Sequence, residues 1–395
     1  MNHPRPHLVF LFSDTGGGHR SAAEAIIGAL EQGYPGQFNC DLVDIFRDFA
    51  PPLLDRIPDI YPPLSRRPKL LGRIFQLSDD PRRIRRILKI IWPYIRSSLD
   101  RLIHAHPADL FVSVHPLINV PLGHALEKAG SNTPWVTVVT DLVTAHTTWF
   151  SPRASLIVVP TEEARQVGLQ RGIAAERLKV VGLPVAEGFS QGNCDPAEIR
   201  ARLGWPLKDP VVLLMGGGEG VGQLETIAAA IDDARLSVTL VIVAGRNKAL
   251  KQVLEARPWK IPTRVYGFVQ EMPDFMHAVD ILLTKAGPGT ISEAIAAGLP
   301  VILYARLDGP EDGNVRYLTD HNAGIWAPRA DLVVAGVIRW LDHPEERARA
   351  ASACRALSRP QAAREIADLI MAQTHDYNSR CQKEISQAEK GGVIP

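Results

Sequence analysis

The stretch TKAGPGTISEAIAAGLPVIL at residues 284–303 passes from an apolar run through a glycine-rich turn into a helical pattern and a second apolar run. Both runs are rich in leucine and β-branched residues, which predicts one strand ending at Lys285 and another starting after Pro300. Residues 287–289 predict an open turn, and Gly298 predicts the end of the helix. A strand, a helix and a strand joined this tightly belong to a parallel sheet, so the stretch predicts an α/β fold.

Eight apolar runs of this kind alternate with amphipathic helical patterns along the chain. Residues 8–12 and 211–215 each lead into three glycines and a helix, with residues 16–18 and 216–218 at equivalent places. Two doubly wound domains in tandem explain this repetition. Residues 186–197 carry Gly, Ser, Asn, Asp and Pro without a hydrophobic period, which predicts a hinge. We therefore expect a first domain over residues 1–188, a second over 189–373, and a polar, frayed tail over 374–395.

The composition is that of a globular protein of 395 residues, with 46% hydrophobic and 22% charged residues. A net charge of +1 gives no overall attraction to a polyanion, so we expect no nucleic-acid partner. The four cysteines lie far apart without metal-ligand spacing, which argues against a structural zinc and a disulfide framework. No apolar run approaches a membrane span and the start lacks a signal-peptide cleavage site, so we expect a cytoplasmic protein that touches membranes only from their surface.

The first domain contains a basic loop over residues 51–101. Between residues 56 and 101 there are twelve basic and four acidic residues, and the prolines of residues 51–81 predict a long loop with short helices. Further on, helical spacing places four apolar residues between 84 and 91 on one stripe, as in a helix that lies on anionic lipid. A helix packed on the first domain with a solvated arginine face is the alternative. The basic residues around the stripe are Arg82, Arg83, Arg85, Arg86 and Lys89.

Glycine-rich turns that lead into helices suit a phosphate, because backbone N–H groups approach the anion and the helix dipole favours it. A tight turn that needs positive φ is the alternative for a single such motif. The candidates in the second domain are Gly217, Gly218, Gly287, Gly289 and Thr290, and those in the first domain are Gly17 and Gly18.

Thr290 stands at the expected N-cap of a helix over residues 291–297, with Glu293 three residues later. Glu293 can therefore reach the sugar hydroxyls of a nucleotide held at the turn. The alternative is a capping box, in which Thr290 and Glu293 satisfy each other's backbone N–H groups.

TKAGPGT with SEAIAAGLP resembles the donor-binding cassette of glycosyltransferase family 28. Six further motifs resemble those of the monogalactosyldiacylglycerol synthases and follow in the same order between about residues 8 and 330. As a set the motifs are specific, although single ones are not. They are SDTGGGHRSAAEAI, VVTDLVTAHTTWF, KVVGLPV, MGGGEGVGQLE, YGFVQEM and GPEDGNVRYL.

The resemblance implies a GT-B fold, in which two Rossmann-like domains face each other across the active-site cleft, with the donor on the second domain and the acceptor mostly on the first. It implies an inverting transfer of a hexose from a UDP-sugar, acting as co-substrate, to the 3-hydroxyl of 1,2-diacylglycerol, without a tightly bound cofactor. The cassette has no DxD-like acidic pair, so we expect amides and helix dipoles, instead of a metal, to stabilise the leaving group.

Galactose is favoured as the hexose because the TDL and GNV motifs look more like those of galactosyl than of glucosyl members. A glucosyltransferase using UDP-glucose, a UDP-sugar epimerase and another GT-B transferase are the alternative enzymes. A protein that senses lipid or UDP-sugar without turnover is the non-enzymatic alternative. We expect a peripheral protein on the anionic inner face of the cell membrane.

The resemblance places the catalytic base at His19, directly after the first glycine turn, whose Gly17 and Gly18 then lie on the acceptor side. An inverting transfer needs a base for the attacking hydroxyl, and an imidazole kept neutral by a helix amino terminus can accept that proton. A histidine that caps its own helix is the alternative. Asp14 is placed either to orient the imidazole or to cap the turn. Trp149 matches a stretch on the acceptor side, where it offers a face to an acyl chain or sugar, or is a buried core residue.

The resemblance also assigns residues to the donor. Glu311 and Asn314 match residues that bond the donor hexose, and the main chain at Phe268 and Val269 matches the stretch that holds uracil. Pro310 stands where the family has glutamine, so one sugar contact is missing or replaced.

Overall fold

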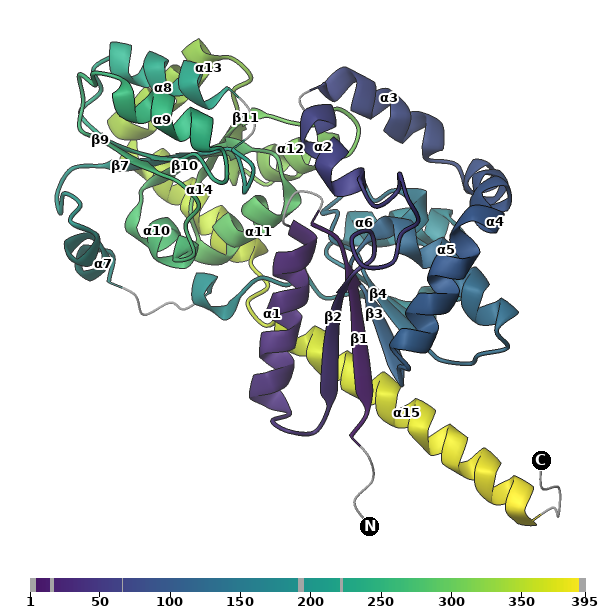
Figure 1. Cartoon of the computed structure of the whole chain (residues 1–395). Helices are drawn as coiled ribbons and strands as arrows, with labels where there is room; N and C mark the ends of the chain where they lie inside the picture. Colours follow the sequence, from purple (N-terminus) through teal and green to yellow (C-terminus); the bar gives the residue numbers. More distant parts are fainter. Residues whose placement is uncertain (1–4, 15–17, 66, 191–194, 221–222, 391–395) are drawn as a thin grey trace.

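The computed structural model describes residues 5–14, 18–65, 67–190, 195–220 and 223–390, and it contains two six-stranded parallel sheets (Figure 1). The strand orders are β2-β1-β3-β4-β5-β6 and β12-β11-β10-β7-β8-β9. The first sheet consists of β1 His7–Phe12, β2 Asn39–Asp44, β3 Leu110–Ser113, β4 Trp135–Val138, β5 Leu156–Val159 and β6 Leu178–Val180. The second consists of β7 Val211–Met215, β8 Thr239–Val243, β9 Thr263–Tyr266, β10 Ile281–Lys285, β11 Val301–Ala305 and β12 Gly324–Trp326.

Helices cover both faces of each sheet, as a doubly wound fold requires. Those of the first half are α1 Gly18–Gly33, α2 Ile57–Ser65, α3 Pro68–Ser78, α4 Pro81–Ala105, α5 Pro116–Lys128 and α6 Glu162–Gln170. Those of the second half are α7 Pro196–Leu203, α8 Leu224–Asp233, α9 Lys248–Ala256, α10 Met272–Ala278, α11 Pro288–Ala297, α12 Asp312–Asp320, α13 Ala330–Asp342 and α14 Pro344–Leu357. The last helix is α15 Ala362–Lys390.

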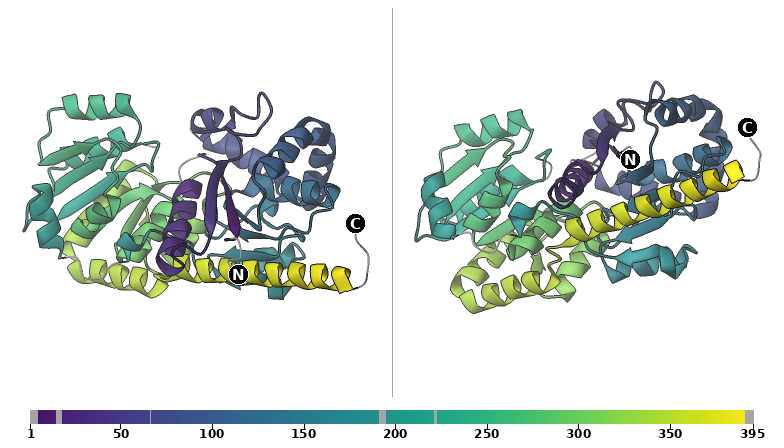
Figure 2. Two further views of the ribbon diagram at one scale, coloured as in Figure 1. Left: turned by 60° about the horizontal axis from the view of Figure 1, so that its bottom comes forward. Right: turned by 90° about the horizontal axis from the view of Figure 1, so that it is seen from below.

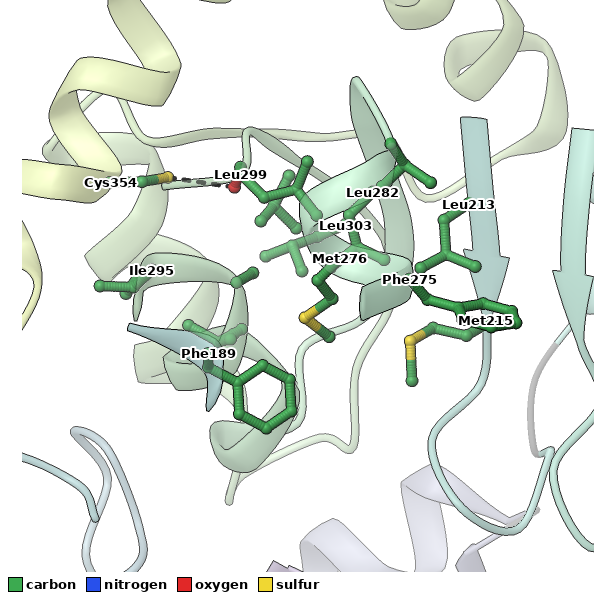
Figure 3. Close-up of a cluster of buried hydrophobic side chains, with 14 of the residues drawn as sticks. Phe189, Leu213, Met215, Phe275, Met276, Leu282, Ile295, Leu299, Leu303 and Cys354 are labelled. Carbon is green, nitrogen blue, oxygen red and sulfur yellow. Dashed lines mark hydrogen bonds between the residues drawn. The ribbon is translucent and has the colours of Figure 1, made fainter. Parts of the chain in front are cut away.

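The strands are buried on both faces. Residues 8–11 of β1 and 211–214 of β7 have no exposed surface. Parallel strands covered by helices on both sides read as continuous apolar runs, which is why they are visible in the sequence. In the second half, Ile295 of α11 and Leu299 just after this helix belong to one buried cluster, part of which Figure 3 shows, and the Sγ–H of Cys354 on α14 donates to the Leu299 carbonyl at 3.3 Å.

The helix α15 does not follow the expected domain division. It leaves the second half and runs across the first sheet, as both views of Figure 2 show. Ile366 and Ile370 are fully buried in the core formed with β1 and β3, and the hydroxyl of Tyr34, just after α1, donates to Asp368 at 2.8 Å. This helix crosses the expected end of the second domain at residue 373 and buries its apolar face on the first sheet. The expected polar tail is helical as far as Lys390.

The basic loop 51–101 folds into α2, α3 and α4. The carboxylate of Asp80 caps α4 by accepting the backbone N–H groups of Arg82 and Arg83 at 2.7 and 2.8 Å. α3 reaches the second half: a side-chain carbon added to Gly72 would lie 2.8 Å from the carbonyl oxygen of Asp308, and one added to Gly309 would lie 3.2 Å from the ring of Phe75. The segment therefore spans from the first sheet to the loop after β11.

Candidate active site

The amino-terminal ends of α1 and α11 lie against each other between the two sheets (Figure 1). Both helices begin at the carboxyl edge of a sheet, after β1 and after β10. A side-chain carbon added to Gly289 would lie 3.9 Å from the Cα atom of Gly18. Two positive helix ends therefore share one cleft, which favours an anionic ligand. The predicted acceptor-side residue Gly17 lies outside the described residues.

The start of α11 differs from the prediction. Its first residue is Pro288 and its N-cap is Gly287, which makes no side-chain cap. Proline favours the first helical position because its φ is already helical, so the helix begins three residues earlier than expected. Thr290 is therefore within the first turn and not at the N-cap. The capping box of Thr290 with Glu293 is excluded, because that motif needs the threonine at the N-cap.

Glu293 lies in the second turn of α11 and is half-buried. Within the part of the chain that the structure describes, no donor reaches its carboxylate, and burial raises its pKa to about 7. A half-buried carboxylate without protein donors is free to accept hydrogen bonds from the hydroxyls of a ligand. The position thus fits a sugar-binding residue.

Lys285, the last residue of β10, adds a positive charge that the sequence analysis did not assign to the site. Its Nζ lies 2.8 Å from Oε1 of Glu311, and the other carboxylate oxygen accepts the backbone N–H of Leu307 at 2.7 Å. A side-chain carbon on Gly287 would lie 2.9 Å from this Nζ, so the ammonium stands directly over the turn. A lysine at a strand end immediately before a glycine-rich turn was the signal that could have revealed it.

Glu311 and Asn314 are buried, with 4% and 1% of their surface exposed. The side-chain amide of Asn314 donates to the Ala286 carbonyl at 2.9 Å, and its Oδ1 has no partner among the described residues. The contacts of the two residues therefore support Lys285 and the turn that follows it. Direct contacts of Glu311 and Asn314 with the donor hexose, which the resemblance implies, stay a prediction.

The second glycine turn follows β7. Gly217 has a φ of 74°, a conformation that favours glycine, and the Gly218 carbonyl accepts the backbone N–H of Arg246 at 2.8 Å. The Arg246 guanidinium lies 4.6 Å from the ring centroid of Phe268, which is 53% exposed. Val269 packs partly buried against the core. An exposed ring beside a phosphate-type turn suits a flat base.

His19, the second residue of α1, faces the end of β4. Its Nδ1 is 2.9 Å from Oγ1 of Thr140, and its ring packs edge-on against His115 with a centroid distance of 4.7 Å. Burial lowers the pKa of His19 to about 4, against the effect of a hydrogen bond with the backbone of Val114. The imidazole is therefore neutral at pH 7 and able to accept a proton. Burial, rather than the helix end, is the main cause.

Asp14 does not orient this imidazole. Its two carboxylate oxygens accept hydrogen bonds from Arg20 at 2.7 Å each, and the arginine holds the pKa of Asp14 below its usual value. Thr140 occupies the place at His19 that had been considered for Asp14. The sequence analysis missed Thr140 because it is 121 residues away along the chain.

Trp149 is fully buried, so the interpretation as a core residue is correct and its ring offers no open face to an acceptor. Its ring centroid lies 6.1 Å from that of His19, and its Nε1–H donates to Asp141 at 2.6 Å. Burial raises the pKa of Asp141 to about 6, and the negative charge of Glu311 contributes to the rise. Asp141 thus lies on the acceptor side facing the donor side, a position that the sequence analysis did not identify.

The five basic residues of α4 that border the predicted stripe are all exposed: Arg82, Arg83, Arg85, Arg86 and Lys89. Of the helices that the structure describes, none is long and apolar enough to cross a membrane. No group of three or more His, Cys, Asp or Glu residues in the described ranges is arranged to hold a metal ion.

Comparison with solved structures defines the class of this fold. The chain superimposes on MurG of Acinetobacter baumannii with a TM-score of 0.59 and 16% identity, over 93% of this chain and 99% of that one. A putative UDP-N-acetylglucosamine 2-epimerase from Listeria monocytogenes gives a TM-score of 0.60 and 15% identity, over 92% and 95% of the two chains. The protein has the GT-B fold, with two Rossmann-like domains and a cleft between them.

Residues 19–185 match the monogalactosyldiacylglycerol (MGDG) synthase family, and residues 211–370 match the glycosyltransferase family 28 C-terminal domain. The chain is 35% identical over 348 residues to a probable MGDG synthase, chloroplastic, of Nicotiana tabacum, covering 85% of this chain and 65% of that protein. It is 32% identical over 372 residues to a probable MGDG synthase 2, chloroplastic, of Oryza sativa subsp. indica, covering 91% and 79%. The chain belongs to the MGDG synthase family. It spans 65% of the length of the tobacco relative.

Proposed function

We propose that the protein transfers a hexose, with galactose favoured, from a UDP-sugar to the 3-hydroxyl of 1,2-diacylglycerol, with inversion at the anomeric carbon. The observation that carries this proposal is the contact of α1 with α11, which sets a neutral His19 imidazole across the cleft from a phosphate-type helix start. The names of its relatives support a galactolipid product.

On the donor side, the diphosphate lies at the start of α11. The N–H groups of Gly289 and Thr290 and the ammonium of Lys285 stabilise the charge that develops on the leaving UDP. Glu311 and Asn314 act on the donor by holding this lysine and the turn at Ala286, over the 2.8 and 2.9 Å contacts described above.

Two further groups bind the nucleoside. Glu293 accepts hydrogen bonds from sugar hydroxyls, which would satisfy a carboxylate that lacks donors in the described chain. Phe268 and the main chain at Val269 hold the uracil, with the Arg246 guanidinium 4.6 Å from the centre of the phenylalanine ring. Gly217 and Gly218 leave room for the donor beside this ring.

On the acceptor side, His19 accepts the proton of the lipid hydroxyl as the hydroxyl oxygen attacks the anomeric carbon. A new carbon–oxygen bond forms on one face of the sugar, while the bond to the UDP oxygen breaks on the other and its electron pair leaves with UDP. A single displacement of this kind inverts the anomeric centre. Thr140 holds the imidazole in the required plane through the 2.9 Å contact with Nδ1.

The protein works on the inner face of the cell membrane as a peripheral protein. Its acceptor is a membrane lipid, and the exposed basic face of α4 suits anionic headgroups. The UDP-sugar is a co-substrate, and the reaction needs no tightly bound cofactor.

A transfer assay with purified protein tests the proposal. Diacylglycerol in mixed detergent micelles is incubated with UDP-galactose or UDP-glucose, and lipid products are separated and identified by mass and linkage. We expect a β-linked monohexosyldiacylglycerol, formed faster from UDP-galactose. A faster reaction with UDP-glucose would identify a glucosyltransferase instead. Conversion of UDP-sugar without lipid would identify an epimerase, and UDP binding without any product would identify a sensor.

A further inference from the structure

An open apolar cavity lies in the first half of the molecule. Its walls are the helices α4 and α5 and the loop that follows β2. Its volume is about 240 Å³. Eighteen of its twenty lining residues are apolar, and the other two are Ser98 and Thr148. The cavity opens at the surface beside Ile87 and Leu117, which are 44% and 47% exposed. Among the residues that the structure describes, no charged side chain lines it.

The inner end of the cavity lies next to the proposed catalytic base. Phe46 lines the cavity and packs edge-on against His115 with a centroid distance of 5.5 Å, and His115 packs against His19 at 4.7 Å. Thr148 also lines it and directly precedes Trp149, whose ring is 6.1 Å from that of His19. One layer of side chains therefore separates the cavity from the imidazole.

The outer rim of the cavity is suited to a lipid surface. Two large apolar residues that adjoin lining residues in the sequence, Leu53 beside Leu54 and Ile90 beside Ile91, are 72% and 78% exposed. The five basic residues of α4 lie on the same helix as the lining residues Ile84, Ile87, Leu88 and Ile91. The apolar stripe that the sequence predicts on this helix thus lines the cavity, while the charges face outward.

We propose that this cavity takes one acyl chain of the diacylglycerol acceptor and thereby holds the glycerol hydroxyl at His19. The inference rests on the proposed function. A sugar or a peptide would lose its hydrogen bonds in a cavity with two polar side chains, whereas an alkyl chain has none to satisfy. A chain that passes from the bilayer into the cavity stays in apolar surroundings, so the cavity orients the lipid without an energetic cost for leaving the membrane.

Binding of short-chain acceptors in water tests the inference without any transfer step. Calorimetric titrations with dihexanoylglycerol and dioctanoylglycerol, both as dispersed monomers and with UDP present, give the affinity and its heat-capacity change. Two additional methylenes of one chain in the cavity should tighten binding roughly 15-fold, with a negative heat-capacity change. Equal affinities for the two lipids would overturn the inference.

Substitutions in the cavity wall test whether the acyl chain lies there. Ala50→Trp, in the loop after β2, and Val120→Trp, on α5, fill the cavity from two sides and should each abolish the chain-length dependence. Ala175→Trp places the same side chain at an exposed site elsewhere in the first half and should leave the dependence unchanged. Unchanged UDP affinity and melting temperature verify that each variant is folded. Retention of the dependence in both filled variants would contradict the assignment.

The two proposals fail in different ways. If the protein binds octanoyl chains in the cavity but makes no glycolipid, the proposed function is wrong. If it makes glycolipid with a rate and affinity that do not depend on chain length or on the cavity variants, the function stands and the cavity assignment is wrong.

Discussion

On the donor side of the cleft, α11 is fixed in the core of the second sheet, whereas on the acceptor side α4 borders an open apolar cavity. Ile295 of α11 and Leu299 just after this helix belong to a buried hydrophobic cluster (Figure 3). On the other side, Leu53 and Ile90 remain largely exposed. The difference suits the two proposed ligands: a diphosphate needs fixed amides at set distances, while an acyl chain needs only apolar room.

The largest expected effect is a loss of turnover without a loss of donor binding. His19→Ala should lower turnover roughly 100- to 10,000-fold, the usual range for a lost general base. UDP affinity should stay near that of the wild type, because the donor lies on the other side of the cleft. Turnover within a few-fold of the wild type would remove His19 from the mechanism. Steady-state kinetics and UDP titration measure the two quantities.

The next effect concerns α15, which belongs by sequence to the second half and by packing to the first. Ile366→Ala removes a fully buried side chain and should lower the free energy of unfolding by about 2–5 kcal/mol. Ile338→Ala on α13, at a residue that is 38% exposed, is the control and should cost much less. Denaturant unfolding measures both. Equal effects of the two substitutions would contradict the role of α15 in the first core.

On the donor side, ionisation of Glu293 should make the stability of the folded protein depend on pH. The pKa of Glu293 is raised to about 7 from 4.5, so the folded protein retains a proton that the unfolded chain has lost. Stability should therefore fall as pH rises from about 4.5 to 7. Glu293→Gln should flatten that fall and weaken UDP binding at pH 8, where the wild-type carboxylate is charged and accepts hydrogen bonds. Unchanged UDP affinity in Glu293→Gln would argue against a sugar contact.

The smallest effect on folding is expected at the basic face of α4. Changing its five exposed basic residues, Arg82, Arg83, Arg85, Arg86 and Lys89, to Gln should leave the melting temperature nearly unchanged, since solvated charges add little to stability.

Vesicle binding should respond strongly to the same five changes. In the wild type it should require anionic lipid and weaken as salt shortens the Debye length from about 10 Å at 0.1 M to about 3 Å at 1 M. The matched control changes five exposed basic residues on other elements: Lys179, Lys208, Lys248, Arg316 and Arg349. Vesicle binding that does not depend on salt would contradict the prediction. Unfolding of the α4 variant would also contradict it, because the five charges would then stabilise the folded protein.

The donor side could be predicted from the sequence because its signals are local. The strand ending at Lys285, the glycine turn and the helix end at Gly298 all lie within fifteen residues, and backbone rules decide them. The start of α11 was the exception, since a threonine and a proline compete for it and the proline determined the outcome. The resemblance covered the same motifs and supplied the position of His19.

The tertiary structure alone decided which distant residues meet. Thr140 reaches His19 across 121 residues, and Lys285 meets Glu311 across 26. The cavity is formed by α4, α5 and the loop after β2. Likewise, α15 packs on the first sheet although it follows the second half in the sequence. No short stretch of sequence predicts these contacts, because burial and ion pairing depend on which surfaces the folded chain brings together. The sequence determined the strands, the turns and the apolar stripe of α4, whereas packing determined that the stripe lines a cavity next to the base.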